Sequence, residues 1–203
     1  MTEDDARDWL LGRYGGVKFA ALERFVAALR LENKRQNLIS RSSEGQIWAR
    51  HIADSAQLEG FAQEAASWLD VGSGAGLPGI VLAIVTDRPV MMVEPRRRRT
   101  EFLTQACDAL SLRLATVHQA MIQNVRAEPF DAITARAYAG LTDIIDSTMH
   151  LARYSTTWIL PKGRTAEQEL EGARSTWQGV FHVERSLTDD EARIIVASGV
   201  KPR

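Results

Sequence analysis

Apolar and charged positions in the first third of the chain follow the spacing of amphipathic helices. From Ala6 to about Leu38, apolar residues such as Leu22, Phe25 and Leu29 recur every three or four positions, with charged residues between them. A shorter segment from Glu44 to Phe61 has the same character. The pattern therefore predicts a helical N-terminal part.

Beyond residue 67, short runs rich in β-branched or aromatic residues predict strands, and helical stretches separate most of them. The predicted strands are Trp68–Val71, Val90–Glu94, Leu114–His118, Ala132–Thr134 and Thr157–Leu160. The predicted helices are Leu77–Val85, Thr100–Leu110, Leu141–Leu151 and Thr165–Thr176. Such alternation is typical of an α/β fold, in which right-handed crossovers join parallel strands.

Two further runs near the end of the chain, Val180–Arg185 and Arg193–Ala197, predict a pair of antiparallel strands joined by the segment SLTDDEA. The whole pattern predicts a Rossmann-like, mostly parallel seven-stranded sheet with helices on both faces. We find no internal repeat and no low-complexity linker. We therefore expect a helical extension over residues 1–63 and a sheet-containing domain over residues 64–203, packed as a single unit.

Composition narrows the class of protein. The chain has 203 residues, no apolar run near the roughly 20 residues that cross a bilayer, and an acidic start unlike a secretory signal. Its single cysteine, Cys107, excludes an internal disulfide and a cysteine-rich metal site. We expect a cytoplasmic monomer without a metal. Because the net charge is −1, a polyanionic partner would need a local basic patch.

The segment LDVGSGAGLPG, residues 69–79, holds four glycines in eight positions directly after the first predicted strand. In a parallel α/β sheet, ligands bind beyond the carboxyl ends of the strands, and the first strand–helix turn is the usual cradle. The glycines let backbone N–H groups come close to a ligand. We therefore expect cofactor contacts from this loop, at Gly72, Ser73, Gly74 and Gly76.

Two acidic residues bear on which cofactor this is. Asp70 lies inside the first strand, where an ionised group needs a donor such as the α-ammonium of a methionine-derived ligand. Glu94 closes the second strand, where a carboxylate can accept both hydroxyls of an adenosine ribose. The pattern Gly74-x-Gly76-x-x-Gly79 also fits a dinucleotide site, but NAD sites usually lack the first acid. The combination favours S-adenosylmethionine over NAD.

Motifs along most of the chain, from about residue 22, resemble the RsmG/GidB family of class I methyltransferases. DVGSGAGLPGI resembles the glycine loop of that family. Asn37-Leu38-Ile39-Ser40 is similar to its N-L-T/I-S segment, and Arg50-His51-Ile52-x-Asp54-Ser55 to its R-H-I-x-D-S. Phe130-Asp131-x-Ile133-x-x-Arg136-Ala137 resembles its F-D-x-[VI]-x-[SA]-R-A, and Lys162-Gly163 lies where the family has a K-G pair.

The resemblance implies an enzyme that methylates guanine N7 in the decoding-region loop of 16S ribosomal RNA, either naked or in a small-subunit particle. S-adenosylmethionine would be the methyl donor and S-adenosylhomocysteine the product. It also implies that Leu77 joins the cofactor loop, that Met121 and Ile122 flank the adenine, and that Arg136 closes the site. Many members have an acid where this chain has Ile122, and Glu94 replaces their aspartate.

Methyl transfer to guanine N7 requires few catalytic side chains. Guanine N7 carries a lone pair and no proton at neutral pH, so methyl transfer needs alignment rather than a general base. Arg136, after the fourth strand, is our candidate catalytic residue linking cofactor and guanine through O6; a helix cap, or a pair with Asp143, is the alternative. Lys162 is the second candidate catalytic residue.

Phosphate groups of an RNA would be bound chiefly by lysine and arginine. Four consecutive arginines begin the helix after the second strand, where positive charge opposes the helix dipole, and this suggests a use in binding. A solvated face is the alternative for this run. His51 fits two interpretations equally well: a contact with RNA, or a histidine packed for structural reasons. The candidate RNA-binding residues are Arg50, His51, Arg96, Arg97, Arg98, Lys162 and Arg164.

Three other functions remain open at this point. A class I methyltransferase with a different acceptor would share the whole cofactor pattern. An NAD-binding oxidoreductase would need a catalytic arrangement that Tyr138 and Lys162, 24 residues apart, do not supply. A non-catalytic RNA-binding module would have little use for the intact acids and glycines.

Overall fold

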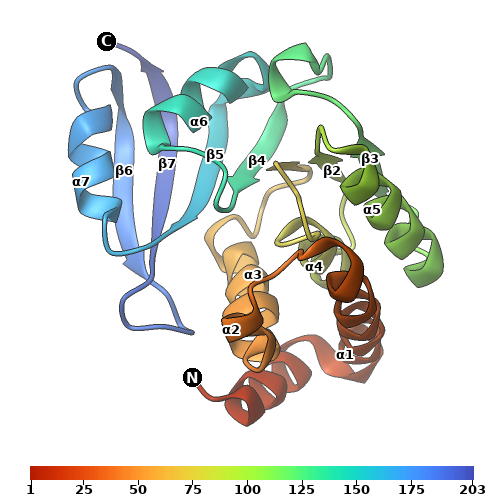
Figure 1. The fold of residues 1–203 in the computed structure, drawn as a ribbon. Coiled ribbons are helices and arrows are strands. Elements are labelled where there is room, and N and C mark those ends of the chain that lie inside the picture. Colours follow the sequence, from red (N-terminus) through yellow and green to blue (C-terminus); the bar gives the residue numbers. More distant parts are fainter.

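The computed structural model describes all residues from Met1 to Arg203 and contains one seven-stranded sheet (Figure 1). The strand order is β3-β2-β1-β4-β5-β7-β6. The pairs among β1 to β5 are parallel. β7 lies between β5 and β6 and pairs antiparallel with both. The strands are β1 (Trp68–Val71), β2 (Val90–Val93), β3 (Ala115–His118), β4 (Phe130–Ala135), β5 (Ala152–Lys162), β6 (Trp177–Arg185) and β7 (Arg193–Pro202).

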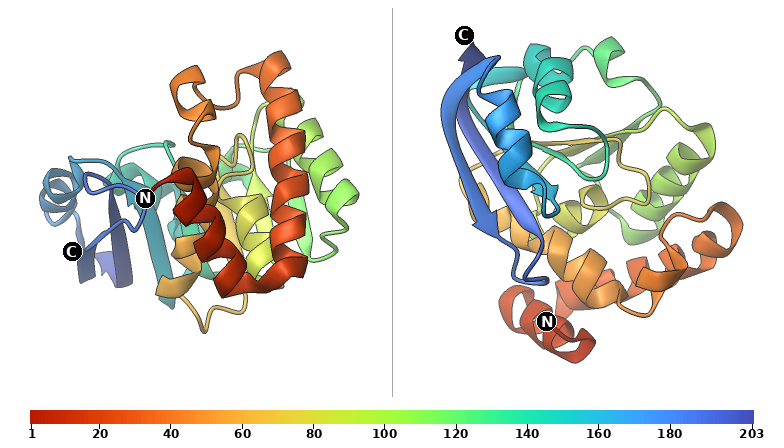
Figure 2. Two further views of the ribbon diagram at one scale, coloured as in Figure 1. Left: turned by 90° about the horizontal axis from the view of Figure 1, so that it is seen from below. Right: turned by 60° about the vertical axis from the view of Figure 1, so that its left-hand side comes forward.

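Helices cover both faces of this sheet (Figure 2). One face packs against α4 (Gly79–Thr86), α5 (Arg97–Leu110) and the N-terminal helix α1 (Glu3–Gln36), and the other against α6 (Leu141–Thr148) and α7 (Ala166–Ala173). Short 3-10 turns, η3 (Ile122–Asn124) and η4 (Met149–Leu151), follow β3 and α6. The α/β prediction is therefore confirmed, including the antiparallel pair at the end of the chain.

Several strands extend beyond their predicted bounds. Trp68–Val71 is found as predicted, because all four residues are buried on both faces. β5 begins five residues before the predicted Thr157, since its first half carries exposed polar side chains. β7 is longer than predicted because the ladder continues through Ser198 to Pro202, and β4 is longer because buried Phe130 and Ala135 extend it at both ends.

The N-terminal segment is divided more finely than its hydrophobic pattern indicates. α1 is interrupted at Gly15, whose φ of +78° breaks the helix and changes its direction. The stretch predicted as one segment from Glu44 to Phe61 consists of several short turns. These are α2 (Arg41–Glu44), the π-helical turn η1 (Trp48–Ala53), α3 (Asp54–Ala56) and the 3-10 turn η2 (Gln57–Phe61).

The helical extension shares its core with the sheet. Leu22, Phe25 and Leu29 are fully buried, and they belong to one cluster of 33 buried residues that also contains Trp68 and Ile80. The predicted apolar face of α1 therefore packs onto the sheet layer and not into a core of its own. None of the helices combines the length and apolar character that crossing a bilayer requires.

Candidate functional site

The glycine loop between β1 and α4 lies at the carboxyl ends of β1 and β2. Its first two amides, from Gly72 and Ser73, both donate to Val93 O at 2.8 and 3.2 Å, which ties the loop to the end of β2. Gly72, Gly74 and Gly76 all have positive φ, between +51° and +80°. These are conformations that residues with a side chain rarely adopt. The loop is thus bent by its glycines into the place where a ligand is expected.

Close approach is the second reason for the glycines. A Cβ at Gly72 would lie 2.5 Å from Tyr138 Cδ2, so the Tyr138 ring rests directly on the loop backbone. A Cβ at Gly79 would lie 2.5 Å from Asp70 Oδ2 and 2.6 Å from Met92 Cγ. The fourth glycine therefore makes room for the buried acid of β1.

Asp70 is fully buried beneath the loop. Its Oδ2 accepts a hydrogen bond from Gly79 N at 3.0 Å, at the start of α4, while its Oδ1 has no partner. Burial raises the pKa of the Asp70 carboxyl to about 7. One oxygen of this carboxylate thus braces the loop–helix junction, and the other is left for a donor.

Glu94 is buried at the tip of β2 and connects two segments. Its Oε2 accepts from Gly74 N at 3.0 Å, and its Oε1 accepts from Arg96 N at 2.9 Å. Arg99 Nη1 lies 3.9 Å from Oε2 and lowers the cost of burying this charge. A carboxylate has about four lone-pair positions, so Glu94 can accept further hydrogen bonds.

Arg136, directly after β4, reaches toward the helical extension and not toward Asp143. Its Nη2 donates to Arg50 O and to His51 Nδ1, both at 2.9 Å, and its Nη1 lies 3.8 Å from Asp54 Oδ2. The next residue, Ala137, has a φ of +50°, a strained value for alanine. The alternative interpretation of Arg136 as a partner of Asp143 is therefore wrong.

Two pockets meet at Arg136. The smaller, of about 470 Å³, is lined by the glycine loop together with Leu38, Ile39 and two arginines, Arg96 at the N-cap of α5 and Arg99 within it. The larger, of about 700 Å³, is open and strongly charged; its lining includes Arg50, Lys162, Arg164, Glu169, Asp189 and Glu191. Arg136 and Ala137 line both pockets.

Lys162 does not extend freely into the larger pocket. Its Nζ donates to Ala139 O at 2.8 Å and lies 2.7 Å from Glu169 Oε2, which also accepts from Leu141 N at 3.1 Å. This ion pair holds the loop between β4 and α6, which carries Arg136 and Tyr138, at its far end.

The other basic residues proposed for RNA divide into two groups. Arg50 lies 3.9 Å from Asp189, and Arg164 pairs closely with Glu191, both at the mouth of the larger pocket. In α5, Arg97 pairs with Glu101 at 2.8 Å. Arg96 and Arg98 are exposed and form no ion pair, so their charges are available to a partner.

Several of the predicted site residues lie apart from both pockets. Met121 is exposed, and Ile122 is buried in the core at the start of η3; neither lines either of these two pockets. His51 does line the smaller pocket, but it is buried, and both of its ring nitrogens are engaged, by Ser43 and by Arg136. No three histidine, cysteine, aspartate or glutamate side chains gather in a way that could hold a metal ion.

Sequence reasoning missed three residues of the site. Tyr138 covers Gly72, Glu169 holds Lys162, and Arg99 lies beside Glu94. The only sequence signal for them was position: Tyr138 follows the Arg-Ala segment by one residue, and Arg99 ends the arginine run.

The fold is shared with methyltransferases of known structure. The O-methyltransferase from Bacillus cereus in complex with SAH aligns with a TM-score of 0.62 at 15% identity, over 88% of this chain and 90% of that one. A SAM-dependent methyltransferase from Aquifex aeolicus aligns with a TM-score of 0.62 at 13% identity, over 81% and 96%. At these identities the likeness shows the fold alone.

Similarity to curated proteins extends over nearly the whole sequence. The ribosomal RNA small subunit methyltransferase G of Erythrobacter litoralis is 45% identical over 200 residues, 98% of this chain and 97% of that protein. The protein of the same name from Sphingopyxis alaskensis is 45% identical over 97% of this chain and 86% of its own length. The model of the GidB family, rRNA small subunit methyltransferase G, matches residues 18–192. The chain belongs to the GidB family.

Proposed function

We propose that this chain transfers a methyl group from S-adenosylmethionine to N7 of a guanine in 16S ribosomal RNA, in the decoding-region loop of the small subunit. The observation that carries the proposal is the position of Arg136 on the border of two pockets. One pocket contains the glycine loop of a methyltransferase fold, and the other is wide and lined by charged side chains. Membership of the GidB family supports an RNA acceptor.

The residues of the glycine loop fit the cofactor. Asp70 Oδ1 is a buried oxygen without a partner, suited to a cationic α-ammonium. Gly72 lines the smaller pocket with its backbone, the space of its missing side chain being filled by Tyr138, and Glu94 has lone pairs left for ribose hydroxyls. When bound, the cofactor supplies an electrophilic methyl group on a sulfonium. Met121 and Ile122 would complete the adenine end of the site from the segment after β3.

The acceptor chemistry fits the side chains of the larger pocket. Guanine N7 needs no base, so the protein has to orient the ring and stabilise charge on its O6 edge. Arg136 supplies hydrogen-bond donors at the border between cofactor and acceptor. Lys162 acts at the other end of the same loop. It donates directly to Ala139 O, and its partner Glu169 accepts from Leu141 N.

We further propose that RNA phosphates bind along a surface from α5 to the larger pocket. Arg96 and Arg98 would contribute free positive charge, and Arg97, Arg50 and Arg164 charge that is paired in the structure. Lys162 and His51 are already engaged within the protein, so their contribution would be through the loop and through Arg136. We propose that the enzyme acts in the cytoplasm as a monomer.

Purified protein tests this proposal in two steps. Calorimetric titration with S-adenosylmethionine should show one site, lost in Asp70→Ala, whose circular dichroism stays that of the wild type. Labelled methyl groups should then appear in 16S ribosomal RNA at a single N7 position, found by strand cleavage at N7-methylguanine. Arg136→Ala should bind the cofactor and transfer at least tenfold more slowly.

The matched control for these variants is Arg113→Ala. Arg113 is an exposed arginine between α5 and β3, at the opposite end of the strands from the glycine loop. It should behave as the wild type in both steps. Methyl transfer to another base, or to another atom of guanine, would contradict the proposal.

A further inference from the structure

We propose that His51 and Asp54 are positioning residues for Arg136: together they fix the plane of its guanidinium group between the two pockets. The inference rests on the proposed function, in which Arg136 contacts the guanine. It assigns a defined role to His51, which the sequence leaves as either an RNA contact or a packed structural histidine, and to Asp54.

The contacts on Arg136 fix its orientation from one side. Nη2 donates to Arg50 O and to His51 Nδ1, both at 2.9 Å. Because the guanidinium group is planar and rigid, two acceptors on one of its nitrogens determine the orientation of the whole group. Arg50 and His51 both lie in the π-helical turn η1, a type of turn found frequently at functional sites.

A chain of hydrogen bonds fixes the tautomer of His51. Since Arg136 can only donate, His51 Nδ1 must be the unprotonated acceptor and Nε2 must carry the proton. Nε2 then donates to Ser43 Oγ at 2.9 Å, and Ser43 Oγ donates to Ser40 O at 3.0 Å. Ser40 is the N-cap of α2, so the orientation of Arg136 depends on the fold of this short helix.

The charge state of His51 agrees with this arrangement. Burial, followed by the positive charges of Arg136 and Arg50, lowers the pKa of His51 to about 4. The imidazole is therefore neutral at physiological pH. A neutral acceptor holds the arginine without drawing its charge away from a substrate.

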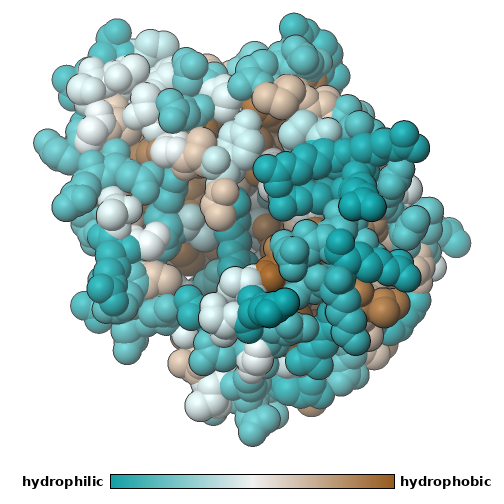
Figure 3. All heavy atoms as spheres, viewed as in Figure 1, coloured by the Kyte–Doolittle hydropathy of each residue, from teal (hydrophilic) through white to brown (hydrophobic).

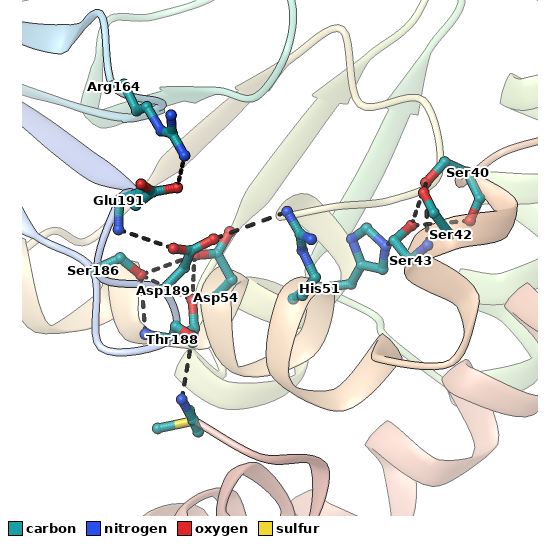
Figure 4. A network of polar contacts seen from close by, with 12 residues as sticks. Ser40, Ser42, Ser43, His51, Asp54, Arg164, Ser186, Thr188, Asp189 and Glu191 are labelled. Atoms are coloured by element: carbon teal, nitrogen blue, oxygen red, sulfur yellow. Dashed lines mark hydrogen bonds and ion pairs between the residues drawn. The ribbon is translucent and has the colours of Figure 1, made fainter.

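Asp54 holds the other terminal nitrogen. Its Oδ1 is saturated by three donors, Gln57 Nε2 at 2.9 Å, Thr188 Oγ1 at 3.0 Å and Ser186 Oγ at 3.2 Å. Figure 4 shows Ser186 and Thr188, from the loop between β6 and β7, converging on Asp54. The remaining oxygen, Oδ2, faces Arg136 Nη1 at 3.8 Å.

The distance of 3.8 Å leaves Arg136 Nη1 without a hydrogen bond although it is buried. A buried donor with no acceptor is uncommon and calls for a reason. Asp54 attracts Nη1 by charge and leaves its hydrogen atoms unused. We infer that this nitrogen becomes bonded when the guanine binds, and that Asp54 keeps it in reach until then.

A double-mutant cycle tests the inference on the full-length protein. His51→Leu, which keeps the volume and removes both nitrogens, should lower kcat for 16S ribosomal RNA about tenfold or more. Asp54→Asn should act in the same direction. Because Asp54 lines only the larger pocket, the dissociation constant of Asp54→Asn for S-adenosylmethionine should stay within about twofold of the wild type. In an Arg136→Ala background, both substitutions should have almost no further effect on kcat, because their target is gone.

Ser55→Ala is the control for general damage to this segment. Ser55 is buried in the next turn and donates to His51 O, but it does not touch Arg136. It should lower the melting temperature while leaving kcat close to that of the wild type. If His51→Leu slows the Arg136→Ala enzyme as much as it slows the wild type, or if Ser55→Ala loses the same activity, the positioning role is wrong.

An NMR measurement separates this inference from the proposed function. In the free wild-type protein the nitrogen shifts of His51 should be those of a neutral ring protonated at Nε2. In Arg136→Ala its pKa should rise. If the wild type does not methylate guanine N7 but His51 shows these shifts, the proposed function fails and the network stands. If His51 is protonated at Nδ1, the network itself is wrong.

Discussion

Glycine at position 72 is required for its backbone angle and for the space that its missing side chain leaves. Its φ of +69° is costly for any other residue, and a Cβ would meet the Tyr138 ring at 2.5 Å. Tyr138 in turn belongs to the loop that starts with Arg136. The cofactor loop and the acceptor loop are therefore in contact at this one position.

Gly72→Ala should lower the free energy of unfolding by about 1–3 kcal/mol, through the strained backbone and the displaced ring. It should also weaken cofactor binding at least tenfold, because the strain falls on backbone that lines the smaller pocket. Thermal melts and calorimetric titration measure the two effects. Gly12→Ala, in a helical position with open space around it, should show neither. Unchanged cofactor affinity in Gly72→Ala would contradict the placement of the site.

Asp70 makes cofactor binding depend on pH in a defined direction. Burial raises its pKa from 3.8 to about 7, so the native protein keeps a proton that the unfolded chain loses above pH 4. The stability that this proton provides is present below that range and is lost as the pH rises through 7. A bound ammonium group favours the ionised carboxylate, so binding below pH 7 should expel the proton.

At pH 6, titration with S-adenosylmethionine should therefore release most of one proton per site. Calorimetry in two buffers with different ionisation enthalpies measures the number directly. Asp70→Asn keeps the shape of the side chain and should abolish the release, with weaker binding. Equal proton release by the variant and the wild type would show that Asp70 is not the partner of the ammonium group.

At the scale of elements, the loop between β6 and β7 places carboxylates on two arginines that we propose for RNA binding, Arg50 and Arg164. Asp189 lies 3.9 Å from Arg50, and Glu191 pairs with Arg164. Figure 4 shows Glu191 beside Arg164 and joined through its backbone N–H to Asp189, next to Asp54. Figure 3 shows this face of the molecule largely covered by hydrophilic side chains. Phosphate groups must therefore compete with these carboxylates.

Asp189→Asn combined with Glu191→Gln should lower KM for the RNA by about two- to fivefold, in line with the modest strength of exposed ion pairs. The affinity for the cofactor should not change. Asp190→Asn is the matched control, since it removes one charge from the same loop without breaking an ion pair. An equal effect of one substitution at Asp190 would assign the gain to net charge and not to the release of Arg50 and Arg164.

What could be predicted from the sequence depended on whether a residue leaves a local signal. Glycines, the acid within β1 and the alternation of strands and helices are visible in short stretches of sequence, and they located the sheet and the loop that we propose for the cofactor. Contacts of Arg136 with His51 span 85 positions, and those of Asp54 with Thr188 span 134. No periodicity links such pairs, so the network around Arg136 was beyond sequence reasoning.

The division of residues 44–61 into short turns was missed for a related reason. Its apolar positions repeat as in an α-helix, and the pattern does not distinguish the i+5 bonds of η1 from i+4 bonds. Packing decides between them. Glu3 of α1 accepts from Trp48 N and Ala49 N at 3.2 and 2.8 Å, and this contact between distant segments starts the turn.

At the scale of the whole molecule, we propose that the helical extension and the sheet unfold as one unit. The cluster of 33 buried residues runs through both without interruption. The extension also supplies Arg50 O, His51 and Asp54 to the network around Arg136. The extension is thus part of the site as well as part of the core.

Native-state hydrogen exchange tests whether the helical extension and the sheet unfold together. Amides in the second half of α1, around Phe25 and Leu29, should exchange with the same free energy of opening as those of β1. The edge strand β6 should open at lower free energy, because it has a neighbour on one side only. Early exchange of α1 with β1 still protected would mean two separate units.

At the scale of the whole molecule, we propose that the protein places one methyl group on one guanine held next to Arg136. Mapping N7-methylguanine in small-subunit ribosomal RNA, from cells with and without this gene, tests that claim most directly. The account predicts that one site disappears in the deletion strain. The wild-type gene and Arg113→Ala should restore it, and Asp70→Ala and Arg136→Ala should not. An unchanged map in the deletion strain, or full restoration by Arg136→Ala, would contradict the account.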